Sequence, residues 1–275
     1  MTALTKFINF ISDPKNNYPN IYIFLYHILK AVQKLLTKIG IYKNKYNNKD
    51  MFNWSLYSLH YKGELIEAKK TTSIEIKPGD YVLENDRLIK KNWAIKPLHL
   101  SHRFLYETIM LLRPKSIFEM GCGTGMHLNN LQTLMPNTTL SGIDLLDNQI
   151  KMLRRSFPYL SATIKAADAT IPFPENFMPP ADIAFTQAVL MHIHTNSLHL
   201  AALANLFKIG RKYVILMESE RTHHYIDDTK KLKTEKKVNW ENIYFYYRLD
   251  PETKQPMSII CSKEQLTSPE YHSFE

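Results

Sequence analysis

The residues best suited to binding a ligand lie in one short segment, which reads IFEMGCGTG from Ile117 to Gly125. Three of the chain's 8 glycines, Gly121, Gly123 and Gly125, fall within five positions there. Because glycine has no Cβ, such a turn can bend sharply and bring backbone N–H groups close to a ligand. Glu119 adds a carboxylate, which suits a cationic or hydrogen-bond-donating ligand better than a pyrophosphate. We therefore expect a ligand at this turn, the alternative being a turn with a purely structural role.

The residues on either side of the turn have the patterns of a strand and a helix. Ser116–Met120 is apolar with strand character, and apolar residues recur at helical spacing from Met126 onward. A strand, a glycine turn and a helix start together expose backbone N–H groups to a polar ligand. The dinucleotide fingerprint is G-x-G-x-x-G, whereas these glycines are spaced G-x-G-x-G and Met126 stands where the third dinucleotide glycine would be.

The segment resembles the first motif of the class I S-adenosylmethionine-dependent methyltransferases, which reads apolar-apolar-(Asp/Glu)-x-Gly-x-Gly-x-Gly. The resemblance implies S-adenosyl-L-methionine as the cofactor. It implies a cofactor site that contains Glu119, Gly121, Cys122, Gly123 and Gly125. We interpret Cys122 as a small residue that fits inside the turn, not as a nucleophile.

Two acidic residues stand at the ends of the next predicted strands. Asp144 follows Glu119 by 25 residues, and Asp168 ends the strand after that. The resemblance implies that Asp144 accepts hydrogen bonds from the ribose hydroxyls, with Leu145 packed on the adenine face. It likewise implies that Asp168 binds the adenine amino group and that Ala169 supplies a backbone N–H. Either aspartate alone is weak evidence, because Asp is common in turns and helix caps.

The fourth predicted strand bears on the acceptor of the methyl group. Residues Thr186–Ile193 read TQAVLMHI, not the Asn/Asp-Pro-Pro-aromatic segment of enzymes that methylate base amino groups. Neither cysteine follows a proline, as a cytosine C5 enzyme would require. The segment is similar to the version found in small-molecule, lipid and sugar methyltransferases, which implies that Gln187 lies near the methionine moiety. We expect O- or N-methylation of a metabolite or glycan.

Three residues are candidates for a catalytic base. A sugar hydroxyl is deprotonated by a group whose pKa is near the working pH. His192, Glu218 and His223 lie at the expected edge of the sheet, and the sequence does not choose among them. His192 and His194 have a metal-ligand spacing, but no carboxylate cluster accompanies them, so we expect no metal site.

From residue 98 onward, predicted strands and helices alternate, which predicts an α/β fold with a parallel sheet covered on both faces. A helix is expected over 100–112, a second at the start of the glycine turn, a third ending near 157 and a fourth near 195–207. Strands are expected at 116–120, 139–144, 162–167, 182–187 and 212–217, followed by a hairpin of 242–249 and 257–262. The resemblance implies a Rossmann-like doubly wound seven-stranded sheet with a terminal antiparallel hairpin, preceded by an N-terminal extension.

We predict three regions: a basic helical arm over 1–50, a small hairpin-containing extension or cap over 51–97, and the methyltransferase domain over 98–275. The hairpin is expected to pair Ser73–Ile76 with Tyr81–Glu84 through a Pro-Gly turn. Two cysteines without a metal-ligand spacing favour a reducing, cytoplasmic compartment.

The arm carries most of the chain's net charge of +9, since residues 1–50 hold eight lysines and two aspartates, a net charge of +6. Residues 21–39 have the spacing of a basic amphipathic helix that is too interrupted by lysine to span a bilayer. This helix either packs on the main domain or lies on an anionic membrane surface. In the second case the protein is in peripheral contact with the inner face of the membrane. No secretory signal peptide is apparent.

We predict a cytoplasmic S-adenosylmethionine-dependent methyltransferase acting on a carbohydrate, a lipid-linked glycan of polysaccharide biosynthesis, or another small metabolite. Lys230–Lys237 is either a solvated helix face or loop, or a site for an anionic acceptor. One alternative is an RNA methyltransferase that uses the basic arm, although the charge of the main domain makes nucleic acid an unfavoured partner. The other is an inactive module that binds the cofactor and regulates a partner.

Overall fold

The computed structural model describes Val32 and residues 74–193, 197–219, 222–250 and 254–274. The chain divides into two compact units, Met1–Ile74 and Glu75–Glu275. Apart from Val32, the predicted arm and its amphipathic helix lie outside the described residues, as do residues 51–73 of the segment 51–97. Among the residues that are described, no helix is long and apolar enough to cross a membrane.

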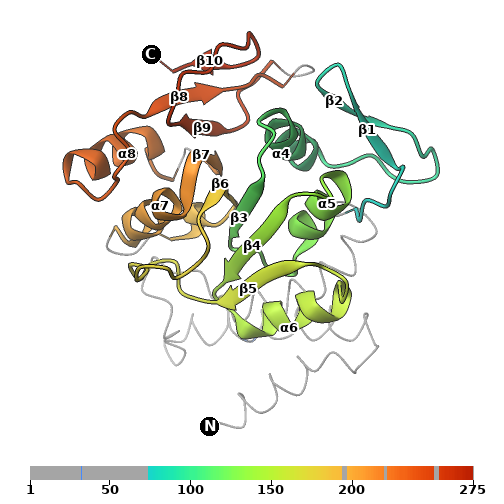
Figure 1. Ribbon diagram of the computed structural model, residues 1–275, viewed down its shortest axis with the longest axis horizontal. Coiled ribbons are helices and arrows are strands. Elements are labelled where there is room, and N and C mark those ends of the chain that lie inside the picture. The colour runs from blue at the N-terminus through green and yellow to red at the C-terminus, as the bar shows by residue number, and fades with distance from the viewer. Residues whose placement is uncertain (1–31, 33–73, 194–196, 220–221, 251–253, 275) are drawn as a thin grey trace. The chain divides into compact units, whose positions relative to one another are not determined.

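An eight-stranded sheet forms the centre of the second unit in the order β10-β8-β9-β7-β6-β3-β4-β5 (Figure 1). Five strands are parallel: β3 (Ser116–Met120), β4 (Thr139–Asp144), β5 (Ala162–Ala166), β6 (Ala181–Gln187) and β7 (Gly210–Met217). Three are antiparallel: β8 (Tyr244–Tyr247), β9 (Ile259–Ser262) and β10 (His272–Ser273). The predicted doubly wound sheet with its terminal hairpin is confirmed, and β10 adds an eighth strand to the predicted seven.

The strand order reverses at β3, which pairs with β4 on one side and with β6 on the other. The chain runs outward from β3 through β4 to β5, and then returns to the far side of β3 as β6 and β7. Ligands of such sheets bind at the carboxyl ends of the strands where the order reverses. Met120 of β3 is in register with Thr186 of β6, so the glycine turn begins beside Gln187.

The helices connect the strands and pack on the sheet (Figure 1). They are α4 (Leu100–Leu111), α5 (Met126–Leu134), α6 (Asp147–Ser156), α7 (Leu198–Ile209) and α8 (Tyr225–Thr234), with a short 3-10 helix η1 (Leu190–His192). Helix α7 packs on β6, β7 and α8, whereas α5 and α6 pack on β4. The lysine-rich segment predicted as a helix face or loop is divided between the two, because α8 ends at Thr234 and the chain then turns.

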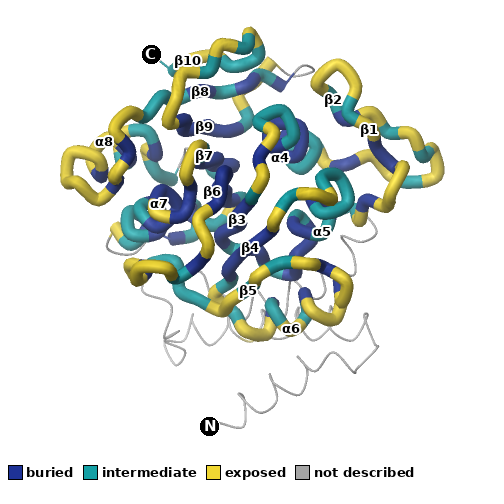
Figure 2. The backbone as a smooth tube through the Cα atoms, viewed as in Figure 1, coloured by how far each residue is buried: buried dark blue, intermediate teal, exposed yellow. Residues whose placement is uncertain are grey.

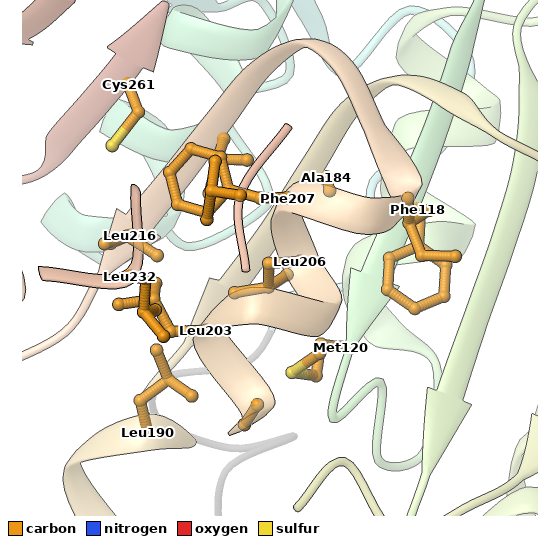
Figure 3. Close-up of a cluster of buried hydrophobic side chains, with 14 of the residues drawn as sticks. Phe118, Met120, Ala184, Leu190, Leu203, Leu206, Phe207, Leu216, Leu232 and Cys261 are labelled. Atoms are coloured by element: carbon orange, nitrogen blue, oxygen red, sulfur yellow. The ribbon is translucent and has the colours of Figure 1, made fainter. Parts of the chain in front are cut away.

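The core lies between the central strands and the helices that cover them (Figure 2). Every residue of β6 is buried except the last, Gln187, as expected of a central parallel strand with both faces covered. One cluster joins Phe118 and Met120 of β3 to the leucines of α7 and to Cys261 of β9 (Figure 3). Burial of these side chains fixes β3 and β6 against each other, and therefore fixes the turns that follow both strands.

The first hairpin differs from the prediction. It consists of β1 (Tyr81–Glu84) and β2 (Arg87–Lys90), joined by Asn85 and Asp86. These two residues have φ of 48° and 62°, the left-handed conformation that two-residue hairpin turns need and that Asn and Asp tolerate. The predicted pairing across Pro78-Gly79 was wrong, because residues 74–77 form no strand and Ser73 lies outside the described residues.

The Pro-Gly turn is closed by local bonds instead. The Asp80 carboxylate accepts from the Lys77 N–H at 2.8 Å and from the Asn92 amide at 2.7 Å. The hairpin itself is attached to α4, because the Leu88 N–H donates to Oε1 of Glu107 at 2.8 Å.

Replacing a core leucine tests this account of the packing. Leu203 of α7 is fully buried in the cluster, so Leu203→Ala is expected to lower the free energy of unfolding by about 2 to 5 kcal/mol. Ile89→Ala on the exposed face of β2 is the matched control and should cost far less. Urea unfolding followed by circular dichroism measures both, and equal losses would contradict the assignment of the core.

Candidate functional site

The glycine turn after β3 needs glycine at both of its ends. Gly121, Gly123 and Gly125 have φ of 76°, 51° and 79°, the left-handed region that favours glycine. A Cβ on Gly121 would lie 2.4 Å from a methyl group of Val189, and one on Gly125 would lie 2.5 Å from Leu153. The turn is therefore packed between the loop after β6 and helix α6, with no room for a side chain at either position.

Hydrogen bonds fasten this turn to β4. The N–H groups of Gly121 and Cys122 both donate to the Ile143 carbonyl at 2.8 Å. The Asp144 carboxylate accepts from the Gly123 N–H and from the Leu146 N–H, each at 2.9 Å. Each Asp144 oxygen retains acceptor capacity for a ligand, since a carboxylate has about four lone-pair sites.

Glu119 is the buried acid beneath the turn. Its side chain is 2% exposed, and Oε2 has no hydrogen-bond partner in the part of the chain that the structure describes. Burial, and then the nearby charge of Asp144, raise the pKa of Glu119 well above its usual value. A buried carboxylate without a donor is unfavourable, so the position suits a ligand that brings a hydrogen-bond donor or a positive charge. The amino group and sulfonium of S-adenosylmethionine fit this requirement.

The ends of β4 and β5 supply the remaining residues of the predicted cofactor site. Asp144 and Ala166 are in register, so Asp168 follows on the neighbouring strand. Oδ1 of Asp168 accepts from the Thr170 N–H at 2.8 Å and from its hydroxyl at 2.7 Å, which leaves Oδ2 for a ligand.

Two apolar side chains beside these acids are exposed. Leu145 is 45% exposed and Ile171 is 61% exposed. The loop between β5 and β6 is held by Asn205, whose amide donates to the carbonyls of Ala169 and Ile171 at 2.9 and 2.8 Å. Exposed apolar side chains beside two carboxylates can cover a flat base while the acids bind polar groups. The residues predicted for the cofactor therefore come together along one edge of the sheet.

Glu218, a predicted base, holds the loop after β6. Its carboxylate accepts from the Val189 N–H at 2.9 Å, the Met191 N–H at 3.0 Å and the Thr186 hydroxyl at 3.0 Å. Burial raises its pKa, and these hydrogen bonds oppose the rise. Because its acceptor sites are used by the loop, the geometry gives Glu218 an anchoring role.

The two predicted catalytic histidines lie on different elements. His192 ends η1, and His223 precedes α8. The ring of His223 stacks on His199 with centroids 3.8 Å apart, and Nε2 of His199 lies 3.1 Å from Oδ2 of Asp228. Both remain predicted bases. No group of three or more His, Cys, Asp or Glu residues in the described ranges could hold a metal ion.

The sequence analysis missed a polar network beside Gln187. Nε2 of His127 is hydrogen-bonded to Oε1 of Gln187, and Nδ1 lies 2.8 Å from the Tyr106 hydroxyl. Asn130 donates to that hydroxyl at 3.1 Å. His127 and Asn130 are three residues apart and so share a face of α5. That spacing is the one sequence signal for the network, and it lies on a helix, not at the end of a strand.

Two histidines of this region are held neutral. Burial lowers the pKa of His127 to about 4, an effect partly opposed by its bond to Gln187. Burial and the neighbouring His127 and His99 lower the pKa of His102 to about 3. The rings of His102 and His127 lie 4.7 Å apart, edge to face. Protonating either ring would place a charge in a partly dehydrated cluster.

These lowered pKa values predict how stability changes with pH. Unfolded histidine titrates near pH 6.5, so the unfolded chain binds protons that the folded chain excludes. Above about pH 6.5 these histidines do not lower the free energy of unfolding. As the pH falls from there toward 4, the free energy of unfolding falls by up to about 1.4 kcal/mol per pH unit for each histidine. We expect the stability difference between the wild type and His127→Gln to shrink as the pH falls from 6.5 to 5.

Urea titrations at several pH values measure this difference. The difference between the two proteins isolates the effect of His127 from that of the buried carboxyl groups. The raised pKa values of those groups change stability with pH in the opposite direction. His272→Gln, at an exposed position, is the matched control and should show no such trend. A difference that stays constant across this range would contradict the neutral assignment of His127.

The comparisons with known proteins agree with this geometry. Residues 117–212 match a protein family described as a methyltransferase domain. No curated protein has a detectable sequence match to the chain.

Among solved structures, a TehB-like SAM-dependent methyltransferase from Corynebacterium glutamicum is 13% identical, with 76% of this chain and 98% of that chain covered and a TM-score of 0.51. CalS10, an amino pentose methyltransferase from Micromonospora echinaspora, is 20% identical, with 45% and 52% covered and a TM-score of 0.39. DesVI from Streptomyces venezuelae is 17% identical, with 43% and 51% covered and a TM-score of 0.37. The match thus spans about half the length of the last two proteins. Similarity at these identities shows the fold alone.

The motif after β3, the order of the strands and the family match all concern the same part of the chain. The match begins at Ile117 in β3 and ends at Lys212 in β7, so it includes Glu119, the glycine turn, Asp144 and Asp168. The chain therefore carries a class I S-adenosylmethionine-dependent methyltransferase domain.

Proposed function

We propose that this protein methylates an oxygen or nitrogen atom of a carbohydrate, a lipid-linked glycan or another small metabolite. The observation that carries the proposal is the end of β6 and the loop that follows it. Residues Thr186–Ile193 contain no Asn/Asp-Pro-Pro-aromatic segment to hold a base amino group, and they contain no cysteine nucleophile. This segment lies beside the glycine turn, because Met120 pairs with Thr186 and Val189 packs on Gly121.

The cofactor side of the proposal depends on the acids along the edge of the sheet. Glu119 would accept a hydrogen bond from the amino group of the methionine moiety, Asp144 would bind the ribose and Asp168 the adenine. When bound, S-adenosylmethionine supplies a methyl group attached to a positively charged sulfur. The chain's own contribution is to orient the two reactants and to exclude water between them.

The acceptor side depends on the loop that Glu218 anchors. With this carboxylate bound to backbone N–H groups and to Thr186, the loop presents one fixed backbone conformation beside Gln187. A hydroxyl acceptor also needs a proton acceptor. His192 at the end of this loop and His223 before α8 are the two candidates that remain after Glu218 is assigned to the loop.

Transfer of a labelled methyl group tests the proposed function. Purified full-length protein is incubated with methyl-labelled S-adenosylmethionine and separate glycan, lipid-linked glycan, small-metabolite and RNA fractions from cells. We expect label in a carbohydrate or small-metabolite fraction and none in RNA. Gly121→Val, which places a branched side chain against Val189, should abolish incorporation, with Gly79→Ala, at an open turn, as the control. Label in RNA alone would overturn the proposal in favour of the RNA methyltransferase.

Binding of the cofactor should release a proton from Glu119. The raised pKa of this carboxyl in the free protein falls when a cationic, hydrogen-bond-donating ligand favours the charged form. Affinity should therefore rise with pH through the raised pKa, and the heat of binding should depend on the ionisation enthalpy of the buffer. Titration calorimetry in phosphate and in Tris measures both effects.

A pair of variants tests whether the proton released on cofactor binding comes from Glu119. Glu119→Gln should lose the dependence on buffer and bind S-adenosylmethionine about 10- to 100-fold more weakly, as expected for a lost hydrogen bond to a charged group. Glu175→Gln, at an exposed position, should behave as the wild type. Unchanged affinity in Glu119→Gln would remove Glu119 from the cofactor site.

A further inference from the structure

A buried asparagine lies among the leucines of α7. The helix reads LHLAALANLFKI, and Asn205 within it is 3% exposed. A buried amide is unfavourable unless its polar atoms are hydrogen-bonded. Both polar atoms of this side chain are bonded, and their three partners all belong to the loop between β5 and β6. The position of Asn205 is therefore explained by that loop, not by the packing of the helix.

The direction of each of these bonds follows from its backbone partner. The Phe173 N–H can only donate, so the atom that accepts from it at 2.9 Å is the amide oxygen of Asn205. The carbonyls of Ala169 and Ile171 can only accept, so the NH2 group donates one hydrogen to each, at 2.9 and 2.8 Å. Three backbone groups thus determine the orientation of the amide, and both of its N–H hydrogens are used.

Two lysines hold the same loop further along. Nζ of Lys208, on the next turn of α7, donates to the Phe173 carbonyl at 2.6 Å. Nζ of Lys165 in β5 donates to the Phe177 carbonyl, also at 2.6 Å. The Phe173 ring is buried and stacks on Phe177, with their centroids 4.4 Å apart. The loop is consequently fastened to the fold at several points along its backbone.

The fastened loop leaves three groups available to a ligand. Oδ1 of Asp168 accepts from Thr170, which leaves Oδ2. The Ala169 N–H makes no hydrogen bond within the part of the chain that the structure describes, and the Ile171 side chain is 61% exposed. An acceptor oxygen, an N–H donor and an apolar side chain match the amino group, the adjacent ring nitrogen and the face of an adenine.

We propose that Asn205 is a positioning residue that gives the cofactor site its preference for adenine. This inference rests on the placement of the adenine at Asp168 in the proposed function, and it does not depend on the acceptor. Asn205 acts through the loop. Fixing the Ala169 carbonyl limits rotation about the Cα of that residue, and so limits the direction of its N–H.

Adenine and hypoxanthine differ at the two positions that this loop would meet. Adenine has an amino donor at C6 and an acceptor at N1, whereas hypoxanthine has a carbonyl acceptor at C6 and a donor at N1. The Asp168 carboxylate and the Ala169 N–H match the first pattern and oppose the second. Such a site rejects the wrong base because its polar groups are left unpaired. A loop that is free to turn away from the mismatch would lose this selectivity.

S-adenosylhomocysteine and S-inosylhomocysteine differ only in the base, so they test the inference directly. Titration calorimetry on the full-length protein gives a Kd for each, and the ratio of the two measures base preference. We expect the wild type to bind the adenine ligand about 100-fold or more tightly than the other. Asn205→Asp keeps the acceptor for Phe173 and removes both donors. In this variant we expect the preference to fall about 10-fold.

Two controls separate the loop from general stability. Asn176→Asp makes the same substitution at an exposed position of the same loop, and it should keep the wild-type preference. Leu203→Ala removes buried packing from α7 without removing a hydrogen bond to the loop. It should lower the melting temperature and leave the ratio of the two Kd values unchanged.

A second variant decides the matter if Asn205→Asp does not fold in thermal melting. Lys208 is exposed, and Lys208→Met removes its bond to the Phe173 carbonyl while keeping an apolar stem. The preference for adenine should fall in the same direction, by about 2- to 10-fold. Lys263→Met, also at an exposed position, is the matched control. An unchanged preference in Lys208→Met would then count against the inference.

The outcomes also separate this inference from the proposed function. A folded Asn205→Asp protein with the wild-type preference, or an equal loss of preference in Leu203→Ala, would remove Asn205 from base recognition and leave the cofactor placement intact. A wild type that binds both ligands equally well would remove the adenine from Asp168, and with it this part of the proposed function. Neither result bears on the acceptor of the methyl group, because no acceptor is present in the titrations.

Discussion

Two backbone N–H groups that share the carbonyl of Ile143 form the joint on which the site depends. They belong to Gly121 and Cys122, and they fasten the end of β3 to the end of β4. The joint requires left-handed backbone at Gly121, and Val189 leaves no space there for a Cβ. Once the turn is fixed, Asp144 closes it through Gly123, and Glu119 lies beneath it. The residues predicted for the cofactor are thus positioned by the packing of β3 against β4 and β6.

Burial of ionisable groups is the second property of this edge. Burial shifts Glu119, Asp144 and Glu218 toward the protonated form, and it shifts His102 and His127 toward the neutral form. In each case burial is the largest cause, so the edge disfavours charge of either sign. A cationic cofactor entering such a site interacts strongly with any carboxylate it meets, because less solvent screens the pair. The same surroundings suit a methyl transfer in which charge is redistributed between sulfur and the acceptor.

The fold could be predicted closely from the sequence, because its signals are local. Strand β3 was predicted with its observed bounds, and β4 ends at Asp144 as expected, since apolar runs bounded by acids and glycines mark buried strands. The hairpin was misplaced because a Pro-Gly pair is a common turn signal. The pair Asn85 and Asp86 is an equally good turn signal. The hairpin forms there because β1 pairs with β2 and the hairpin is attached to α4.

The site was predictable only where each residue acts through its place on a strand. Glu119 lies one residue before the end of β3, and Asp144, Asp168 and Gln187 end or follow strands, so topology brings the four together. Glu218 also follows a strand, but its carboxylate holds the loop after β6. The three groups that donate to it belong to Thr186, Val189 and Met191. Their approach depends on how the chain turns after β6, which residue spacing does not encode.

The network around His127 shows why contacts between side chains are harder to predict than the ends of strands. Its members come from the segment before β1 and from α4, α5 and β6, as far apart in sequence as Ile76 and Gln187. The bond from the Ile76 N–H has a direction fixed by its donor, because a backbone N–H cannot accept. An amide at the end of β6 can serve as donor or acceptor, and its sequence position is the same in both cases. The surroundings of this strand end therefore depend on side chains of α4 and α5 that residue spacing alone does not bring together.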